Sequence, residues 1–208
     1  MKEMVFKKGL INPISLLILM SIAMPVAFNA WSAMLNNFVV EKAAFTGVEI
    51  GILQSLREVP GFLSFTLIFV LLIIKEQTFA VFALALLGLG VCMTGFFPSV
   101  YGLYFTTILM STGFHYFEAV KQSLSLQWLS KEEAPMVLGR LLAVGSLTSL
   151  IVYGCLWVLL EVFQLPYLIN FVIAGGICIL LAFVMYIGFP SFPSKVEQNQ
   201  NLVLRKRY

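Results

Sequence analysis

The chain carries few charged side chains and no aspartate at all. Charged residues make up 11% of its 208 positions, whereas a soluble domain carries about 25%. Hydrophobic residues make up 60%, and the uncharged runs 10–40 and 162–194 are longer than a soluble core helix needs. This composition excludes an ordinary soluble domain. Because backbone polar groups must pair internally in hydrocarbon, runs of this length predict membrane helices.

Side chains that enzymes and metal sites use are equally scarce. The chain has one histidine and three cysteines, Cys92, Cys155 and Cys178, which lack CxxC spacing and lie within apolar runs. We predict that all three cysteines are buried small apolar residues, with no metal and no cofactor. HExxH is absent, and no Ser motif accompanies the histidine as a six-span intramembrane protease requires. The sequence therefore predicts a protein that is not an enzyme.

Six apolar stretches are each long enough to cross a bilayer, which takes about 20 residues in a helix. The first is about twice the length of a signal-peptide core and has no small-x-small cleavage site, so we predict that it is a membrane helix. We therefore expect an all-α membrane protein with a six-helix domain over residues 1–190 and a polar cytoplasmic linker or tail over 191–208. The predicted spans are 14–35, 47–74, 79–97, 101–126, 137–160 and 167–188.

Positive charge falls mainly on one side of this topology. Lys42 lies on the other side and Arg57 lies within a span. Because Lys and Arg are retained in cytoplasmic loops, we predict that both termini are cytoplasmic and that the chain lies in the plasma (inner) membrane. The net charge of +3 arises from these loops and predicts no nucleic-acid partner. The eleven residues on the basic side are Lys2, Lys7, Lys8, Lys75, Lys121, Lys131, Arg140, Lys195, Arg205, Lys206 and Arg207.

Polar side chains form a stripe along the predicted fourth span. Ser111, His115, Glu118, Gln122 and Ser125 are spaced 4, 3, 4 and 3 residues apart, which places them within about 80° on one helix face. Ionisable groups are costly in lipid, so the stripe must face protein or a water-filled cavity. Hydrogen-bonded packing against another helix is the alternative. A stripe that holds two ionisable residues favours the cavity.

The second predicted span carries an arginine near the middle of the bilayer. Arg57 precedes Glu58 and Pro60, and a buried arginine needs an anionic partner. Adjacent helix residues point about 100° apart, so we predict Glu118 rather than Glu58 as that partner. A structural ion pair and a functional one remain equally open.

Two further spans carry similar polar spacing, and together the spans give a candidate pathway for solute or protons. The first span presents Asn29, Ser32 and Asn36, and the fifth presents Ser146 and Ser149. The predicted solute and proton pathway consists of Asn29, Ser32, Asn36, Arg57, Glu58, His115, Glu118 and Gln122.

A faint internal repeat relates the two halves of the domain. Phe28-Asn29 corresponds to Phe114-His115 when 28–55 is aligned with 114–146. Spans one to three and four to six would then cross the membrane in opposite senses, which is the pattern of a 3+3 inverted repeat. Substrate sites in repeat transporters lie near the midplane, between such repeats.

With these features the chain resembles the N-terminal half of a major facilitator superfamily transporter. The runs QSLREVPGFL at 54–63 and GFHYFE at 113–118 are similar to those of a bacterial branch of that superfamily whose substrate is unknown. The resemblance implies that spans one and four line a central cavity flanked by Arg57. It also implies two departures: Lys75-Glu76-Gln77 replaces the superfamily's GxxxDRxGRR loop, and the fifth span lacks the proline of antiporters.

Two functions follow as expectations. The first is transport of a small-molecule solute by alternating access, with Glu118 or His115 carrying a proton. The alternative is a non-transporting membrane scaffold or assembly subunit. Six spans alone would leave polar stripes against lipid, so we expect a C-terminal half, a partner subunit or a homodimer in the bilayer. Sugars, amino acids, organic acids and drugs all suit side chains of this kind.

Overall fold

The computed structural model describes residue 9 and residues 11–193, and these residues are helical with no β-strand. The basic residues at positions 2, 7, 8, 195 and 205–207, and the predicted tail from 194 onward, lie outside this part. The described elements are α1 (Pro13–Ala43), α2 (Gly47–Phe62), a 3₁₀ turn η1 (Leu63–Thr66), α3 (Leu67–Leu71), α4 (Glu76–Thr94), α5 (Val100–Trp128), α6 (Ala134–Trp157), a π-helical turn η2 (Val158–Val162) and α7 (Tyr167–Gly188).

These elements form six rods that correspond to the six predicted spans. The second rod consists of α2, η1 and α3, and the fifth consists of α6 and η2. Four rods, α1, α4, α6 with η2, and α7, are long and apolar enough to cross a membrane. The helix α2 has only 16 residues, and α5 contains the polar stripe. The fold is therefore all-helical and compatible with a membrane protein.

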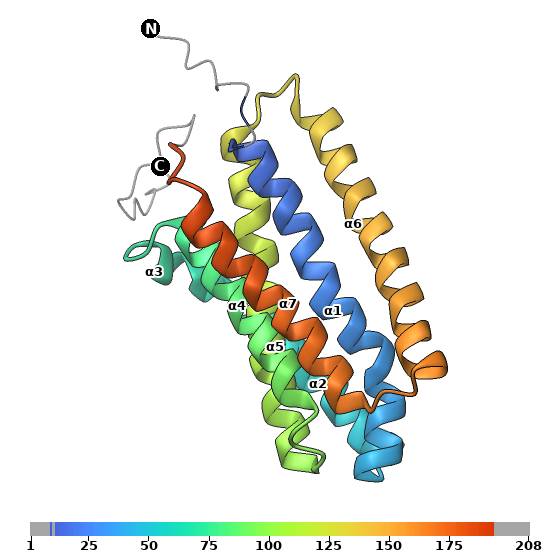
Figure 1. The fold of residues 1–208 in the computed structure, drawn as a ribbon. Helices are drawn as coiled ribbons and strands as arrows, with labels where there is room; N and C mark the ends of the chain where they lie inside the picture. Colours follow the sequence, from blue (N-terminus) through green and yellow to red (C-terminus); the bar gives the residue numbers. More distant parts are fainter. Residues whose placement is uncertain (1–8, 10, 194–208) are drawn as a thin grey trace, which may run out of the picture.

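Successive rods run in alternating directions (Figure 1). At one end of the bundle, Gln77 at the start of α4 hydrogen-bonds Pro190 and Phe192 beyond α7. At the opposite end, Tyr167 at the start of α7 donates a hydrogen bond to Glu41 of α1, with an O–O distance of 3.1 Å. We refer to the end where α1, α4 and α6 begin as the first end, and to the opposite end as the second end.

Capping residues in the sequence precede α1, α2 and α5 and account for where these helices begin. The Asn12 side chain caps α1 by accepting a hydrogen bond from the Ser15 amide, and Pro13 occupies the first turn, where its missing N–H costs nothing. Thr46 and Glu49 form a capping box at the start of α2. The Ser99 side chain accepts from the Gly102 amide at the start of α5.

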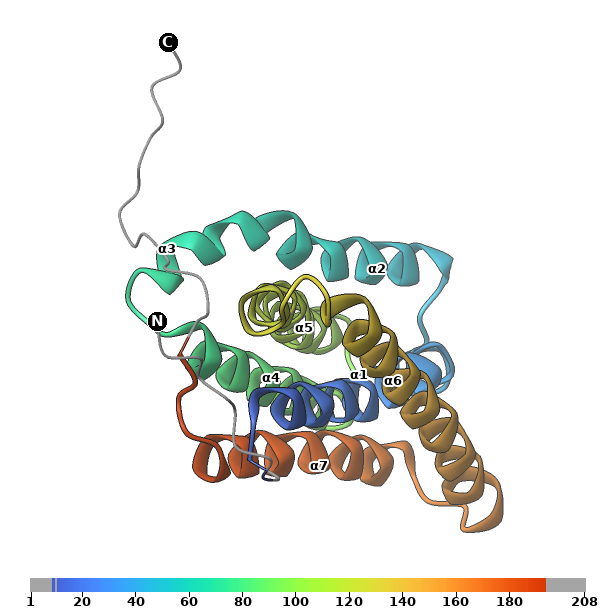
Figure 2. The same cartoon turned by 90° about the horizontal axis from the view of Figure 1, so that it is seen from above.

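The helix α4 lies at the centre of the bundle, with its closest packing against α5 and α7. In Figure 2, α7 and α2 occupy opposite sides of the bundle, and α6 lies beside α1 at the edge. Glycines allow the close approach of α4. A Cβ on Gly113 would lie 2.6 Å from the Ala83 carbonyl oxygen, and a Cβ on Gly88 would lie 2.7 Å from that of Gly175. Small residues at crossings are typical of helices that associate within a membrane.

Two sequence expectations are corrected by the fold. The second rod does not continue as one helix to residue 74, because α2 ends at Phe62, two residues after Pro60, and α3 ends at Leu71. Cys178 is buried as predicted and Cys92 is half-buried, but Cys155 is exposed. The prediction for Cys155 was wrong because α6 packs mainly on α1 and presents its remaining face outward.

A buried hydrogen bond joins α1 to α4. Trp31 Nε1 donates to Thr94 Oγ1 across 3.2 Å, and neither residue is accessible to solvent. Thr94→Val should leave the indole N–H unpaired and lower the free energy of unfolding by about 1–3 kcal/mol. The measurement is the thermal midpoint of the purified chain in detergent. Thr112→Val removes a hydroxyl that bonds only its own helix, so it should lower the midpoint much less, and an equal loss in the two variants would contradict this role.

Candidate functional site

A cavity of about 500 Å³ lies between α1, α5 and α6. Its lining extends over 21–29 of α1, 114–125 of α5 and 138–149 of α6, so it occupies the half of the bundle nearer the first end. The wall combines apolar residues with a group of polar ones. The polar lining residues are Ser21, Asn29, Glu118, Lys121, Gln122, Ser125, Ser146 and Ser149.

The two charged residues of the wall form an ion pair along α5. Lys121 Nζ lies 3.4 Å from Glu118 Oε1, one helical turn away. The Lys121 side chain is 18% exposed and that of Glu118 is 40% exposed. Lys121 Nζ also lies 5.9 Å from the centroid of the Phe117 ring, where a cation is attracted to the aromatic face. The cavity therefore contains both signs of charge with part of each group turned toward its interior.

Polar residues of α1 and α6 meet at the deep part of the cavity. Asn29 Nδ2 donates to Ser149 Oγ across 2.6 Å, and Ser149 Oγ donates to the Gly145 carbonyl across 2.8 Å. The polar spacings of the predicted first and fifth spans therefore face each other. Ser32 and Asn36 lie further along α1 toward the second end, are exposed, and do not line the cavity.

An aromatic pair lies at the inner limit of the cavity. Phe28 of α1 and Phe114 of α5 stack with ring centroids 4.1 Å apart and an interplanar angle of 14°. The lining on α1 ends at Asn29 and that on α5 ends at Phe114. The stacked rings thus mark the boundary between the cavity and the half of the bundle nearer the second end.

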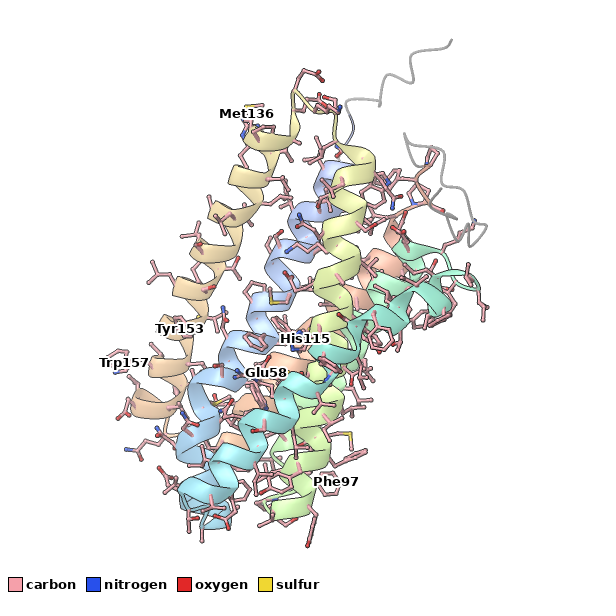
Figure 3. All side chains as sticks on the ribbon, turned by 180° about the vertical axis from the view of Figure 1, so that it is seen from behind. Glu58, Phe97, His115, Met136, Tyr153 and Trp157 are labelled. Carbon is pink, nitrogen blue, oxygen red and sulfur yellow. The ribbon has the colours of Figure 1, made fainter. Side chains whose placement is uncertain are left out.

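Arg57, Glu58 and His115 form a second polar cluster, between α2 and α5. Figure 3 labels two of these residues, Glu58 and His115. Arg57 Nη2 and Nε lie 2.7 and 2.9 Å from Glu58 Oε1, and His115 Nε2 lies 3.8 Å from Glu58 Oε2. The predicted pairing of Arg57 with Glu118 is wrong, since Glu58 is the partner. The Cβ atoms of adjacent residues diverge, but two long flexible side chains can fold toward each other, whereas Glu118 is held by Lys121.

The polar stripe on α5 is therefore shared between two neighbours. Ser111 donates to the Arg57 carbonyl, and the His115 ring packs on Gly61, where an added Cβ would lie 2.7 Å from Cε1. Glu118, Gln122 and Ser125 instead line the cavity. The division arises because α2 contacts α5 from Tyr104 to His115, while the space facing α6 lies nearer the first end. No single wall receives all five side chains.

The single histidine of the chain gives a direct test of the second cluster. Glu58→Gln removes the anion that lies nearest to His115, so the ¹⁵N chemical shifts of the imidazole should change. Glu118→Gln, one turn further along the same helix, should leave those shifts unaltered. The measurement is a histidine-labelled NMR spectrum of the chain in detergent. A larger change for Glu118→Gln than for Glu58→Gln would contradict this arrangement.

Several cavity residues were not identified as site residues from the sequence. Ser21, Pro25 and Asn29 are spaced four residues apart, so they share one face of the helix. This spacing could have placed Ser21 beside Asn29 in the predicted site. Lys121 lies at the edge of the polar stripe of α5. The stacking of Phe28 on Phe114 had no sequence signal beyond the faint repeat. Within the described residues, no three His, Cys or Glu side chains gather as metal ligands would.

Comparison with known protein families, with curated proteins and with solved structures finds no match for this chain. The cavity, the two polar clusters and the arrangement of the helices are therefore the features that bear on function.

Proposed function

We propose that the chain is a membrane-embedded transport unit that moves a small solute by alternating access, in the manner of the N-terminal half of a major facilitator superfamily transporter. The observation that carries the proposal is the polar cavity between α1, α5 and α6. Pockets of about 300–1,000 Å³ hold small molecules, and a cavity of about 500 Å³ falls within that range.

The energetic cost of the Glu118–Lys121 pair favours transport over a purely structural role. A charged group in the middle of a membrane costs at least about 2.5 kcal/mol by insertion measurements. Hydrogen bonds between uncharged residues can hold helices together without that cost. Here both charged side chains line the cavity, and α5 and α6 make few contacts with each other. A water-filled pathway accounts for both features.

The position of Phe28 and Phe114 supports the inverted-repeat interpretation. The repeat alignment pairs these two residues, and they stack on each other in the structure. Residues that lie on a pseudo-twofold axis contact their own equivalents, so this contact is expected if the axis passes between α1 and α5. Transporters that contain inverted repeats bind solute next to such an axis.

Charge distribution supports an orientation with the first end in the cytoplasm. Among the described basic residues, Lys75, Lys131 and Arg140 lie toward the first end, Lys42 lies at the second, and Arg57 and Lys121 lie within α2 and α5. Cytoplasmic loops carry an excess of Lys and Arg. In this orientation the cavity is nearer the cytoplasm, and the chain lies in the plasma (inner) membrane.

The exposed polar side chains support association with a second membrane unit. Ser32, Asn36 and Glu58 are exposed in the described structure and do not line the cavity. Contact with lipid would be costly for these groups, whereas contact with a C-terminal half, a partner subunit or a second copy would give them polar neighbours. The alternative function, a membrane scaffold, uses the same surface for assembly and leaves the cavity without a role.

Thiol accessibility tests the proposal. Single cysteines at Ser146 and Gln122, two exposed residues of the cavity wall, should react with a charged, water-soluble thiol reagent in native membranes. Cysteines at Leu180 and Phe183, which are exposed on the apolar helix α7, serve as lipid-facing controls and should remain inert. The parent chain carries Cys155→Ala, and its labelling is subtracted.

The two functions predict different labelling patterns. Transport predicts that both cavity positions react at least about ten-fold faster than both controls, because the reagent reaches them through water. Inert thiols at positions 122 and 146 would refute the water-filled pathway and would favour the scaffold.

A further inference from the structure

A buried hydroxyl in the cavity wall has no hydrogen-bond partner. The Ser21 side chain is 1% exposed and lines the cavity, and among the described residues its Oγ bonds to no group. Buried polar groups are nearly always paired, and an orphan one calls for an unseen partner. A ligand group that enters the cavity would give the hydroxyl a partner.

The ion pair beside Ser21 also has unused bonding capacity. An ammonium has three donors and a carboxylate has about four acceptor positions, but Lys121 and Glu118 share only one contact. At 3.4 Å that contact is longer than the roughly 2.7–2.9 Å of a strong charged hydrogen bond. Both groups can therefore bind a ligand while they remain next to each other.

These three groups lie at similar depth in the bundle. Ser21 is eight residues from the start of α1, or about 12 Å along the helix. Lys121 and Glu118 are seven and ten residues from the end of α5, or about 11 and 15 Å. A small molecule in the cavity can therefore reach a hydroxyl, a cation and an anion together.

Another part of the wall near this depth is apolar. Met24 of α1 and Leu138 and Leu141 of α6 line the same part of the cavity, and the Phe28–Phe114 stack limits it on the inner side. An apolar side chain of a ligand would lie against these residues, away from the charged groups. The wall thus has one strongly polar and one apolar region.

We propose that the solute of this site is a small zwitterion of the α-amino acid type, which rests on the transport function proposed above. Its carboxylate binds Lys121 and accepts a hydrogen bond from Ser21 Oγ, its ammonium binds Glu118, and its side chain packs on the apolar region. The Glu118–Lys121 pair is neutral as a whole, so a singly charged solute would bring one uncompensated charge into the cavity, which is costly away from water. A zwitterion compensates both charges.

Protection of a cavity thiol tests this assignment. The full chain with Ser146→Cys and Cys155→Ala is labelled in detergent with a water-soluble thiol reagent, alone and with glycine, L-leucine or L-phenylalanine. The matched singly charged controls for L-leucine are leucinamide, which lacks the carboxylate, and 4-methylpentanoate, which lacks the ammonium. An amino acid at ten times its Kd leaves about one-tenth of the sites free, so labelling should slow about ten-fold.

The expected result is protection by at least one of the three amino acids and none by the two controls at the same concentration. Equal protection by 4-methylpentanoate or by leucinamide would overturn the zwitterion assignment in favour of a singly charged solute. Rapid labelling that no amino acid slows would overturn it while the water-filled pathway stands. No labelling at all would refute both the assignment and the proposed function.

Variants of the two charged residues give a second measurement. Lys121→Gln in the Ser146→Cys chain should abolish protection by the amino acid. Glu118→Gln should weaken the protection without abolishing it, because the amide oxygen of Gln can still accept a hydrogen bond from the ammonium. The unprotected labelling rate should be retained in both variants. That retained rate shows that the cavity is still formed. Lys131→Gln, which changes a lysine outside the cavity, should leave protection intact. Full protection in both the Lys121 and the Glu118 variants would contradict their assigned roles.

Discussion

Gly113→Val should prevent the chain from accumulating in a folded form. A Cβ at this position would collide with the backbone of Ala83 and Leu87 in α4, including a 2.7 Å contact with Leu87 Cα. Backbone atoms cannot relieve a clash by changing rotamer, as a flexible side chain can. The helix α5 must therefore move away from α4, the helix against which it packs most closely. Overpacking usually costs about 1–3 kcal/mol, and we expect at least the upper end of that range.

The matched control is Gly139→Val in α6. A Cβ at Gly139 would meet nothing within 4 Å, and the change in helix propensity and volume is the same. The measurement is the amount of monodisperse protein extracted from membranes, together with its thermal midpoint. Retention of both values in Gly113→Val, or an equal loss in the two variants, would contradict the packing of α4 against α5.

Glu118→Gln should abolish solute accumulation driven by a proton gradient and leave solute exchange in place. The substitution preserves the shape of the side chain but removes the group that can take up and release a proton in the cavity wall. Accumulation needs that proton step, whereas exchange needs only the movement of the loaded site. We expect the accumulated solute to fall at least about ten-fold, toward its equilibrium level.

Proteoliposomes with an imposed pH gradient provide the measurement, with the labelled solute that the unaltered chain accumulates. Glu161→Gln is the control, because Glu161 is exposed in η2 and does not line the cavity. His115→Gln distinguishes the second polar cluster from the cavity, and its effect should be smaller than that of Glu118→Gln. Undiminished accumulation in Glu118→Gln would exclude this residue as the proton carrier.

The six rods were predictable from the sequence because their positions follow from long apolar runs. The breaks within the rods were less predictable. Pro60 signals an interruption, but the 3₁₀ turn begins only at Leu63, and nothing in the apolar pattern marks the π-helical turn at Val158–Val162. Such local changes depend on how a rod packs on its neighbours, which a single-helix pattern does not contain.

The candidate site was predictable in its residue types but not in its pairings. Helical periodicity placed Glu118 and Gln122 on one face, and both line the cavity. It could not show that His115 of the same stripe faces Gly61 and Glu58, because that depends on where α2 crosses α5. The Arg57 pairing failed because backbone direction predicts the position of Cβ, whereas the end of an arginine side chain reaches several ångströms further.

The most direct test of transport is to measure from which side of the membrane a reagent can reach the cavity. Gln122→Cys in the Cys155→Ala chain is exposed to an impermeant thiol reagent in inside-out and in right-side-out vesicles. Alternating access predicts labelling from both sides, with proportions that change when the transported solute is added. Labelling from one side alone, unchanged by solute, would show a closed pocket and would contradict the transport function.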